Sequence, residues 1–188
     1  MQAVSRLLSL PRKIPPQSKK NFLRKKRSRR NSSREPPPAL LRHADLRKVV
    51  RLAPLIAIDL IVRNPRGQVL LGLRNNAPAK GFYFVPGGMI LKNERLRQAF
   101  TRLAKNEINR KAELDDARFL GIYEHFYADN RFGEPGYGSH YVVLGYELRL
   151  DDASGLKTDA QHSELRWWSK AELLASDAVH ENAKAYLR

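Results

Sequence analysis

The sequence predicts an α+β domain built on a mixed β-sheet. Apolar, β-branched and aromatic stretches are interleaved irregularly with helical patterns, and turn residues join some of the stretches as hairpins. The chain has 188 residues, of which 42% are hydrophobic, enough for one domain with a sizeable core. This irregular order favours α+β over a doubly wound fold, and no internal repeat is present.

The first elements follow from periodicity and turn chemistry. Residues 43–52 have apolar side chains at helical spacing, which predicts a short helix. Residues 55–63 form an apolar run typical of a buried strand, and residues 68–73 are its expected partner. The Asn-Pro-Arg-Gly turn at residues 64–67 joins the two as a hairpin.

The middle of the chain combines a short strand with the longest predicted helix. Residues 81–86 are aromatic and extended, and the Pro-Gly-Gly turn ends this strand. A helical pattern then covers residues 94–108, and Asn93 is the expected N-cap.

The last third of the chain is predicted to hold three strands and two helices. Residues 119–127 and 140–150 are long strands separated by a Gly/Pro loop, and residues 164–168 are a short strand. Ser169 opens a capping box with the glutamate three residues later, which predicts a short helix there. Residues 177–187 are the last predicted helix.

The net charge of +16 is concentrated near the start of the chain. The first forty residues hold twelve of the 35 Lys and Arg residues and a single acid, Glu35. They also contain six of the eleven prolines, no glycine and one aromatic residue. We therefore expect residues 1–39 to be a disordered basic extension, followed by a domain over residues 40–188. Three interpretations stay open: a nucleic-acid or anionic-surface arm, an organelle transit peptide, or a dispensable extension such as a start-site artefact.

The composition excludes several protein classes. The chain has no cysteine, which rules out a disulfide scaffold and a cysteine-bound zinc site. The longest apolar run covers residues 52–62 and contains Asp59, so it is too short and too polar to span a bilayer. Without interleaved aromatic residues in the basic segment, a stacking platform for nucleic acid is not expected. We expect a cytoplasmic protein.

One acidic side chain falls on the apolar side of the helix predicted over residues 94–108. Glu107 lies in the stripe formed by Leu96, Phe100 and Leu103. A carboxylate there must find a cation, because burying an unpaired charge is costly. Either an arginine at the edge of the core pairs with it, or it binds a metal ion together with the carbonyls of the preceding Gly-Gly turn.

The spacing of Gly88, Glu94, Arg102 and Glu107 resembles the Nudix box, Gly-x5-Glu-x7-Arg-Glu-U-x-Glu-Glu-x-Gly-U, where U is a bulky aliphatic residue. The chain departs from that pattern at three residues: Leu103 and Asn106 stand in place of glutamates, and Asn109 stands in place of glycine.

Further stretches make the chain similar to one Nudix branch, the GDP-mannose mannosyl hydrolases, from about Leu40 to Tyr186. They are Phe84–Gly88, His125–Tyr127, His140–Gly145, Gln161-His162, Arg166-Trp167 and Leu174–Asp177. The resemblance implies a Nudix fold with a mixed sheet sandwiched between helices, and a homodimer. It also implies that water attacks the anomeric carbon with inversion, so that GDP leaves and free sugar is released.

The resemblance assigns a role to each candidate residue. His162 is the expected general base, and Gly88 (through its carbonyl), Glu107 and Gln161 are the expected Mg²⁺ ligands. Arg74 is the expected clamp on the β-phosphate. The other expected active-site residues are Asp59, His125 and Tyr141, and those expected to contact the nucleotide are Leu40, Leu41 and Leu46.

Purely structural interpretations of the same residues, without a role in binding or catalysis, stay open at this point. The polar candidates could be solvated loop or strand-end residues, Asp59 could be paired, and His125 and Tyr141 could be satisfied core residues. Met89 stands where the resemblance expects an arginine that helps neutralise the diphosphate, so Lys80 or Lys92 would have to supply that charge. The alternative functions are a Nudix pyrophosphatase, which would release a nucleoside monophosphate and a sugar phosphate, and a weakly catalytic nucleotide-sugar binding module.

Overall fold

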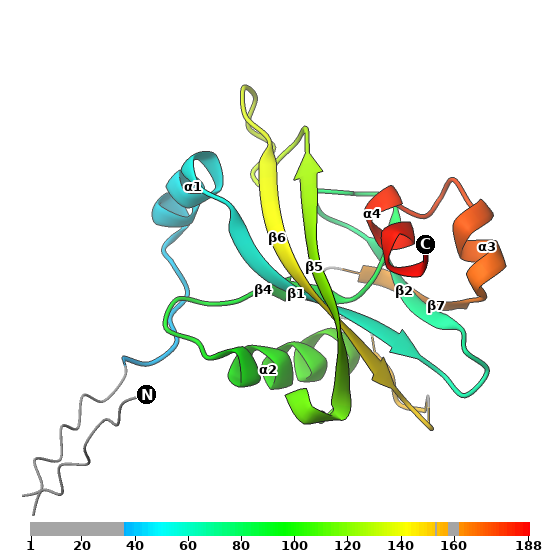
Figure 1. The fold of residues 1–188 in the computed structure, drawn as a ribbon. Coiled ribbons are helices and arrows are strands. Elements are labelled where there is room, and N and C mark those ends of the chain that lie inside the picture. The colour runs from blue at the N-terminus through cyan, green and yellow to red at the C-terminus, as the bar shows by residue number, and fades with distance from the viewer. Residues whose placement is uncertain (1–35, 153, 158–161) are drawn as a thin grey trace, which may run out of the picture. The chain divides into compact units, whose positions relative to one another are not determined.

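The computed structural model of the protein describes residues 36–152, 154–157 and 162–188 (Figure 1). Most of the extension predicted over residues 1–39 therefore lies outside the described residues. The last four residues of that segment are exposed, and Ala39 pairs with Lys92 as an isolated β-bridge.

A seven-stranded mixed sheet forms the centre of the described domain, with the order β3-β2-β1-β6-β5. In addition, β4 pairs with β1, and β7 pairs with β2. The central pair, β1 and β6, is parallel, whereas the other pairs are antiparallel. The strands are β1 (Leu55–Arg63), β2 (Val69–Arg74), β3 (Tyr83–Phe84), β4 (Gly87–Met89), β5 (Ala117–Tyr127), β6 (Ser139–Arg149) and β7 (His162–Trp168).

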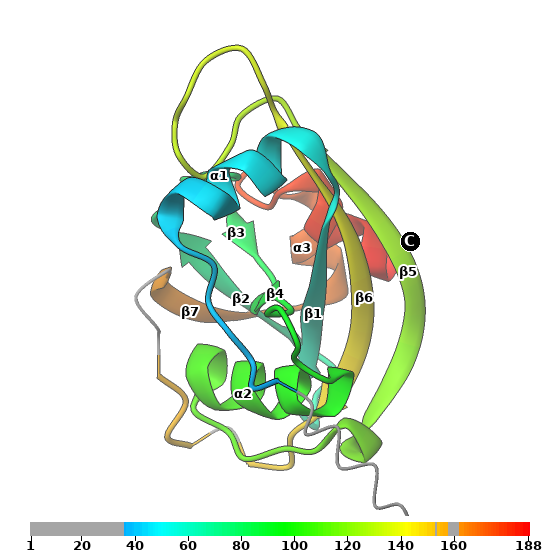
Figure 2. The same cartoon turned by 90° about the vertical axis from the view of Figure 1, so that its left-hand side faces the viewer.

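Helices cover both faces of this sheet, which confirms the predicted α+β class (Figures 1 and 2). The helices are α1 (His43–Leu52), α2 (Leu96–Ile108), η1 (Leu114–Asp116), α3 (Lys170–Ala175), α4 (Glu181–Lys184) and η2 (Ala185–Leu187). Within the described residues, no helix is both long enough and apolar enough to cross a membrane.

Strand β1 is buried on both faces because it supplies side chains to two separate cores. Ile58, Leu60 and Val62 pack with the apolar face of α2, where Phe100 is fully buried. Ile61 points to the opposite face and packs with residues of β2, α3 and α4. The alternation of side chains along a strand explains this division, and the burial of both sets stabilises the sheet.

The way in which β1 changes partners opens the space for a site. Its first half pairs with β4, placing Ile58 opposite Gly88 and Asp59 opposite Gly87, whereas its end pairs with β2 at Arg63. A Cβ atom on Gly87 would lie 2.5 Å from the carbonyl oxygen of Ile58. Glycine is therefore required for β4 to lie this close to β1.

Two predicted helix boundaries are wrong. Asn93 does not cap α2: it has a φ of 64°, and the helix begins three residues later, at Leu96. The helix predicted over 177–187 is confined to α4 and η2, because Val179 forms a bridge with Tyr83 and His180 caps α4 through its ring Nδ1. The capping box at Ser169 is confirmed.

Asn109 ends α2 in the left-handed region, with a φ of 53°. Glycine adopts this conformation most easily, and asparagine is the common second choice. Its side chain also donates to the carbonyl of Gly155 and accepts from Lys105. The departure from the box glycine at this position therefore preserves the helix end.

Candidate active site

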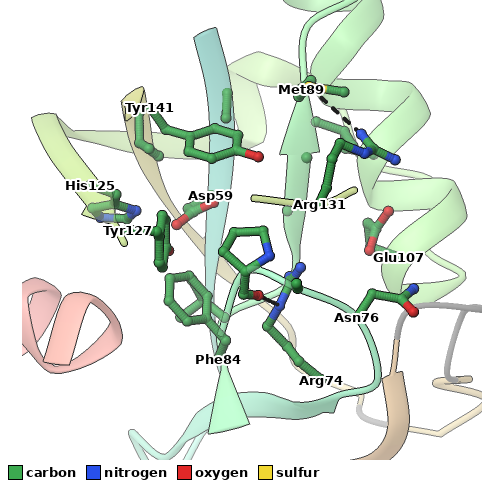
Figure 3. Close-up of a pocket in the computed structure, with 18 of the residues that line it drawn as sticks. Asp59, Arg74, Asn76, Phe84, Met89, Glu107, His125, Tyr127, Arg131 and Tyr141 are labelled. Carbon is green, nitrogen blue, oxygen red and sulfur yellow. Dashed lines mark hydrogen bonds between the residues drawn. The ribbon is translucent and has the colours of Figure 1, made fainter. Parts of the chain in front are cut away.

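A cavity of about 730 Å³ opens beside the β1–β4 pair (Figure 3). Its walls are contributed by β1, β4, β5, β6, α2, the loop that follows β2 and the loop between β5 and β6. The predicted site residues that line it are Leu40, Asp59, Arg74, Gly88, Glu107, His125 and Tyr141. Residues from seven separate segments of the chain therefore meet where the sequence analysis places the site.

The remaining candidates are placed differently. His162, Leu41 and Leu46 are not among the residues that line the cavity, and Gln161 lies outside the described residues. Leu46 is on α1, and Leu41 precedes that helix.

Asp59 is a buried carboxyl at one end of the cavity, with 6% of its surface exposed. Its Oδ2 accepts a hydrogen bond of 2.7 Å from the hydroxyl of Tyr186, which lies 3.3 Å from Nε2 of His125. Burial raises the pKa of Asp59 to about 7, against the opposing effects of the Tyr186 hydrogen bond and the charge of Arg74. A carboxyl that titrates near neutral pH can act as a general acid or base.

Aromatic side chains surround this end of the cavity. Burial, together with the charge of His180, lowers the pKa of His125 to about 4, so its ring is neutral at pH 7. Phe84 packs edge-on against His125, with 5.8 Å between ring centroids, and Tyr127 packs edge-on against Tyr141 at 5.9 Å. Flat apolar walls with hydroxyl groups suit a ligand that has both apolar faces and polar edges.

Glu107 approaches the cavity from α2 at the other end. It is buried, with 4% of its surface exposed, and a Cβ atom on Gly88 would lie 4.0 Å from its Oε1. The arginine at the edge of the core, Arg102, pairs instead with Glu94 through contacts of 2.6 and 2.8 Å. Arg102 therefore forms its salt bridge with Glu94 and not with Glu107.

The donors at this end fit a hard divalent cation. In the part of the chain that the structure describes, no three His, Asp or Glu side chains are grouped as metal ligands. One buried carboxylate and the carbonyls of a Gly-Gly strand are oxygen donors, and Mg²⁺ commonly takes one or two carboxylates and completes its shell with water and phosphate. Glu107 and Gly88 are therefore suited to Mg²⁺.

His162 lies behind Glu107, at the start of β7. Its Nδ1 is 4.0 Å from Oε2 of Glu107, and its side chain is fully buried. The ring packs on Gly72, where a Cβ atom would lie 2.4 Å from it. Because the adjoining residues 158–161 are not described, the role of His162 as general base stays a prediction.

Besides Arg102, which pairs with Glu94, three cationic side chains line the cavity. Arg74 donates from Nε to the carbonyl of Pro78 at 2.9 Å, and its guanidinium lies 5.9 Å from the ring centre of Phe84. Lys80 and Arg131 also line the cavity, whereas Lys92 does not. Of the two lysines expected to replace an arginine at residue 89, only Lys80 is therefore in place.

Sequence reasoning missed Tyr186, Tyr127 and Arg131. Tyr186 is distant in the sequence from Asp59, and nothing in its local pattern indicates that contact. Arg131 follows Asn130 in the Gly/Pro loop, and asparagine in such a loop is typical of a structured turn. That turn signal was the only available indication that the loop has a fixed shape.

A mixed sheet between helices, with a Gly-Gly strand leading into a helix that directs a glutamate at the cavity, defines a Nudix hydrolase. The NUDIX domain model matches residues 53–188. The chain therefore belongs to the Nudix family.

A curated relative supports the same conclusion. The chain is 42% identical over 118 residues to the low-salt glycan biosynthesis protein Agl8 of Haloferax volcanii, and this match covers 63% of the chain and 72% of Agl8.

Solved structures share the fold at lower sequence identity. The MutT protein from Methanosarcina mazei Go1 matches with a TM-score of 0.58 and 17% identity, over 71% of this chain and 91% of that one. The NUDIX domain of Shewanella oneidensis NrtR, complexed with ADP ribose, matches with a TM-score of 0.56 and 19% identity, over 78% and 95%. These matches confirm the Nudix fold.

Proposed function

We propose that the chain hydrolyses a nucleoside diphosphate sugar, GDP-mannose or a related GDP-hexose, to GDP and free sugar in the presence of Mg²⁺. Water attacks the anomeric carbon and inverts its configuration. The observation that carries this proposal is the replacement of the acidic cluster on α2. Leu103 is buried in the core and Asn106 is exposed, so Glu107 is the carboxylate of this helix that lines the cavity.

The chemistry of attack at carbon agrees with this reduced set of acids. A reaction at phosphorus requires the metal site to prepare the attacking water as well as to hold the phosphates. Attack at carbon requires a base elsewhere and a neutralised leaving group. One carboxylate with carbonyl oxygens is sufficient for the second task. The name of the relative Agl8, a glycan biosynthesis protein, supports a substrate that contains a sugar.

The two ends of the cavity receive different parts of the substrate in this proposal. Glu107, Gly88 and Gln161 hold Mg²⁺, which when bound supplies positive charge to the departing diphosphate. Arg74 holds the β-phosphate through its planar fork. The nucleotide contacts are assigned to Leu40, Leu41 and Leu46, of which Leu40 lines the cavity.

The sugar is assigned to the end that contains Asp59, His125 and Tyr141. The Tyr186 hydroxyl contacts Asp59 and His125, and Tyr127 packs against Tyr141, so these side chains orient the sugar without large rearrangement. At neutral pH His125 is uncharged and acts through hydrogen bonds rather than through charge.

Two residues compete for the role of base. The resemblance assigns it to His162, which adjoins Glu107. Asp59 is favoured by its place in the cavity wall and by a pKa raised to about 7. Either would take a proton from the attacking water, and the pH–rate profile of variants distinguishes them.

Product analysis tests the function directly. The full chain is incubated with GDP-mannose and Mg²⁺, and proton NMR follows the early time course. We expect GDP and mannose, with the β anomer formed first. Release of GMP and mannose 1-phosphate would contradict the proposal and favour the pyrophosphatase. Glu107→Gln should abolish the reaction and weaken Mg²⁺ binding in a protein that still folds.

The same assay assigns the base. His162→Gln should lower kcat by about 10²- to 10⁴-fold, leave KM nearly unchanged and remove the acidic limb of the profile. If that limb persists in His162→Gln and disappears in Asp59→Asn, Asp59 is the base. A homodimer stays a separate prediction that light scattering of the purified chain tests.

A further inference from the structure

We propose that Arg131, on the loop between β5 and β6, is a second phosphate-binding arginine that acts with Arg74 on the diphosphate of the substrate. The inference rests on the proposed function in one respect, that the cavity receives a diphosphate. It does not depend on the sugar, the base or the bond that is broken.

The loop that carries Arg131 has a shape that is fixed by one buried side chain. Asn130 has 0% of its surface exposed. Its Oδ1 accepts from the backbone N–H groups of Phe132, at 3.0 Å, and Glu134, at 3.3 Å. Its Nδ2 donates to the carbonyls of Glu134, at 2.8 Å, and Tyr137, at 2.9 Å. Because this amide is hydrogen-bonded on both sides, the backbone next to it is set before any ligand binds.

The same loop is docked on α1, and Figure 2 shows the two next to each other. The ring of Phe132 packs edge-on against His43, with 4.7 Å between centroids. Glu134 forms a 2.7 Å ion pair with Arg47. Of the two acids in the loop, Asp129 and Glu134, Glu134 is therefore engaged by α1 and is not the partner of Arg131.

Arg131 itself lines the cavity and has only a weak protein partner there. Its Nη1 lies 3.9 Å from the sulfur of Met89, and a thioether is a poor acceptor for a guanidinium. Within the described residues it forms no ion pair with a carboxylate. Its planar set of N–H donors is thus available to an oxyanion, which it can bind with two parallel hydrogen bonds.

The two arginines act on the same region of the cavity. Burial raises the pKa of the Tyr141 hydroxyl. The positive charges of Arg131 and Arg74 both oppose that rise, whereas the carboxylates of Asp129 and Asp59 add to it. Figure 3 shows both side chains inside the cavity, together with Tyr141 and Glu107. Two guanidinium groups that line one cavity can bind the oxygens of two linked phosphates. A diphosphate fits this arrangement.

Binding measurements with phosphate probes test the inference. Calorimetry on the full chain with Mg²⁺ would compare GDP, ADP, inorganic pyrophosphate and guanosine. Arg131→Gln should weaken binding of the two nucleotides and of pyrophosphate by about 10- to 100-fold, the range for losing a charge-assisted hydrogen bond, and leave guanosine unchanged. Arg131→Lys should recover only part of the loss, because it restores the charge without the fork.

The matched control is Arg66→Gln on the β1–β2 turn. Arg66 is exposed and does not line the cavity, so this change removes the same charge elsewhere and should alter GDP binding less than about twofold. Unchanged GDP affinity in Arg131→Gln, or an equal loss in Arg66→Gln, would overturn the inference. Products of a pyrophosphatase would refute the proposed function, whereas selective loss of diphosphate binding in Arg131→Gln would still support this role.

Discussion

The burial of Asp59 lowers the stability of the folded protein only when its carboxyl is ionised. Its pKa is raised to about 7 in the folded state, chiefly by burial, and lies near 4 in an unfolded chain. The native state therefore holds this proton between about pH 4 and pH 7, where the unfolded state has lost it. The contribution of Asp59 to stability is most favourable below pH 4 and is lost as the pH rises to 7.

Asp59→Asn should therefore stabilise the protein, and more so at high pH. At pH 8 the gain should be on the order of a few kcal/mol, because the carboxyl is then fully ionised in the native parent, whereas below pH 4 the gain should vanish. Urea unfolding of parent and variant at pH 4, 6 and 8 measures it, with the exposed Asp151→Asn as a control that should change little. A gain that is the same at every pH would show that the ionised carboxyl is not the cause.

Met89 has a consistent explanation if Arg131 binds phosphate. The resemblance expects an arginine at residue 89, and the guanidinium of Arg131 contacts the Met89 sulfur. The positive charge would then reach this part of the cavity from the β5–β6 loop instead of from β4. The spacing of the Nudix box residues gives no indication of such a relocated charge.

At the scale of elements, the pairing of β4 with β1 is the most sensitive contact of the site. In Gly87→Ala the new methyl group would meet the Ile58 carbonyl at 2.5 Å and Oδ1 of Asp59 at 2.6 Å, so β4 would have to move. We expect a loss of about 1–3 kcal/mol in the free energy of unfolding and a large loss of activity, because Gly88 moves with the strand.

Gly88→Ala provides the control for that effect. Its nearest neighbour would be the end of the Leu103 side chain, at 2.9 Å, which can rotate away more easily than a backbone carbonyl. Thermal unfolding of both variants should place Gly87→Ala clearly below Gly88→Ala. Equal stability of the two variants would refute the argument from close strand approach.

The elements that the sequence predicts well are those with local signals. The first helix and β1 have the predicted boundaries, because an amphipathic period and an apolar run each lie within one segment. The start of α2 was predicted wrongly, because Asn93 forms a turn, and Arg102 holds the carboxylate of Glu94 ahead of the helix. Asparagine directly before a helical pattern is a typical N-cap residue, even where the folded chain uses it in a turn instead.

At the scale of the whole molecule, the site depends on contacts that no local pattern encodes. The family resemblance identifies seven of the residues that line the cavity, because it depends on the order and spacing of motifs along the chain and not on knowledge of the fold. It gives no indication of Tyr186, whose hydroxyl donates to Asp59 although the two residues are 127 positions apart. Such a contact arises only once distant segments of the chain have come together.

The basic extension should be unnecessary for the chemistry. The Nudix match begins at residue 53, and Ala39, which pairs with Lys92, is retained when residues 1–38 are deleted. The truncated chain should keep kcat and KM for GDP-mannose within about twofold of the full chain, because the lining residues that the structure describes begin at Leu40 and are all retained. A loss of tenfold or more would mean that the extension contributes to the site or to an interface.

The parallel pairing of β1 with β6 has a consequence for how the chain reaches its fold. Leu55 pairs with Tyr141 and Arg63 with Arg149, so the centre of the sheet joins segments from opposite halves of the sequence. Such non-local contacts slow folding, because a long loop must close before they form. While the protein is being synthesised, β1 leaves the ribosome long before its neighbour exists. Until β6 arrives, its open apolar edge is a place where nascent chains can associate, so expression at high concentration favours aggregation through this strand.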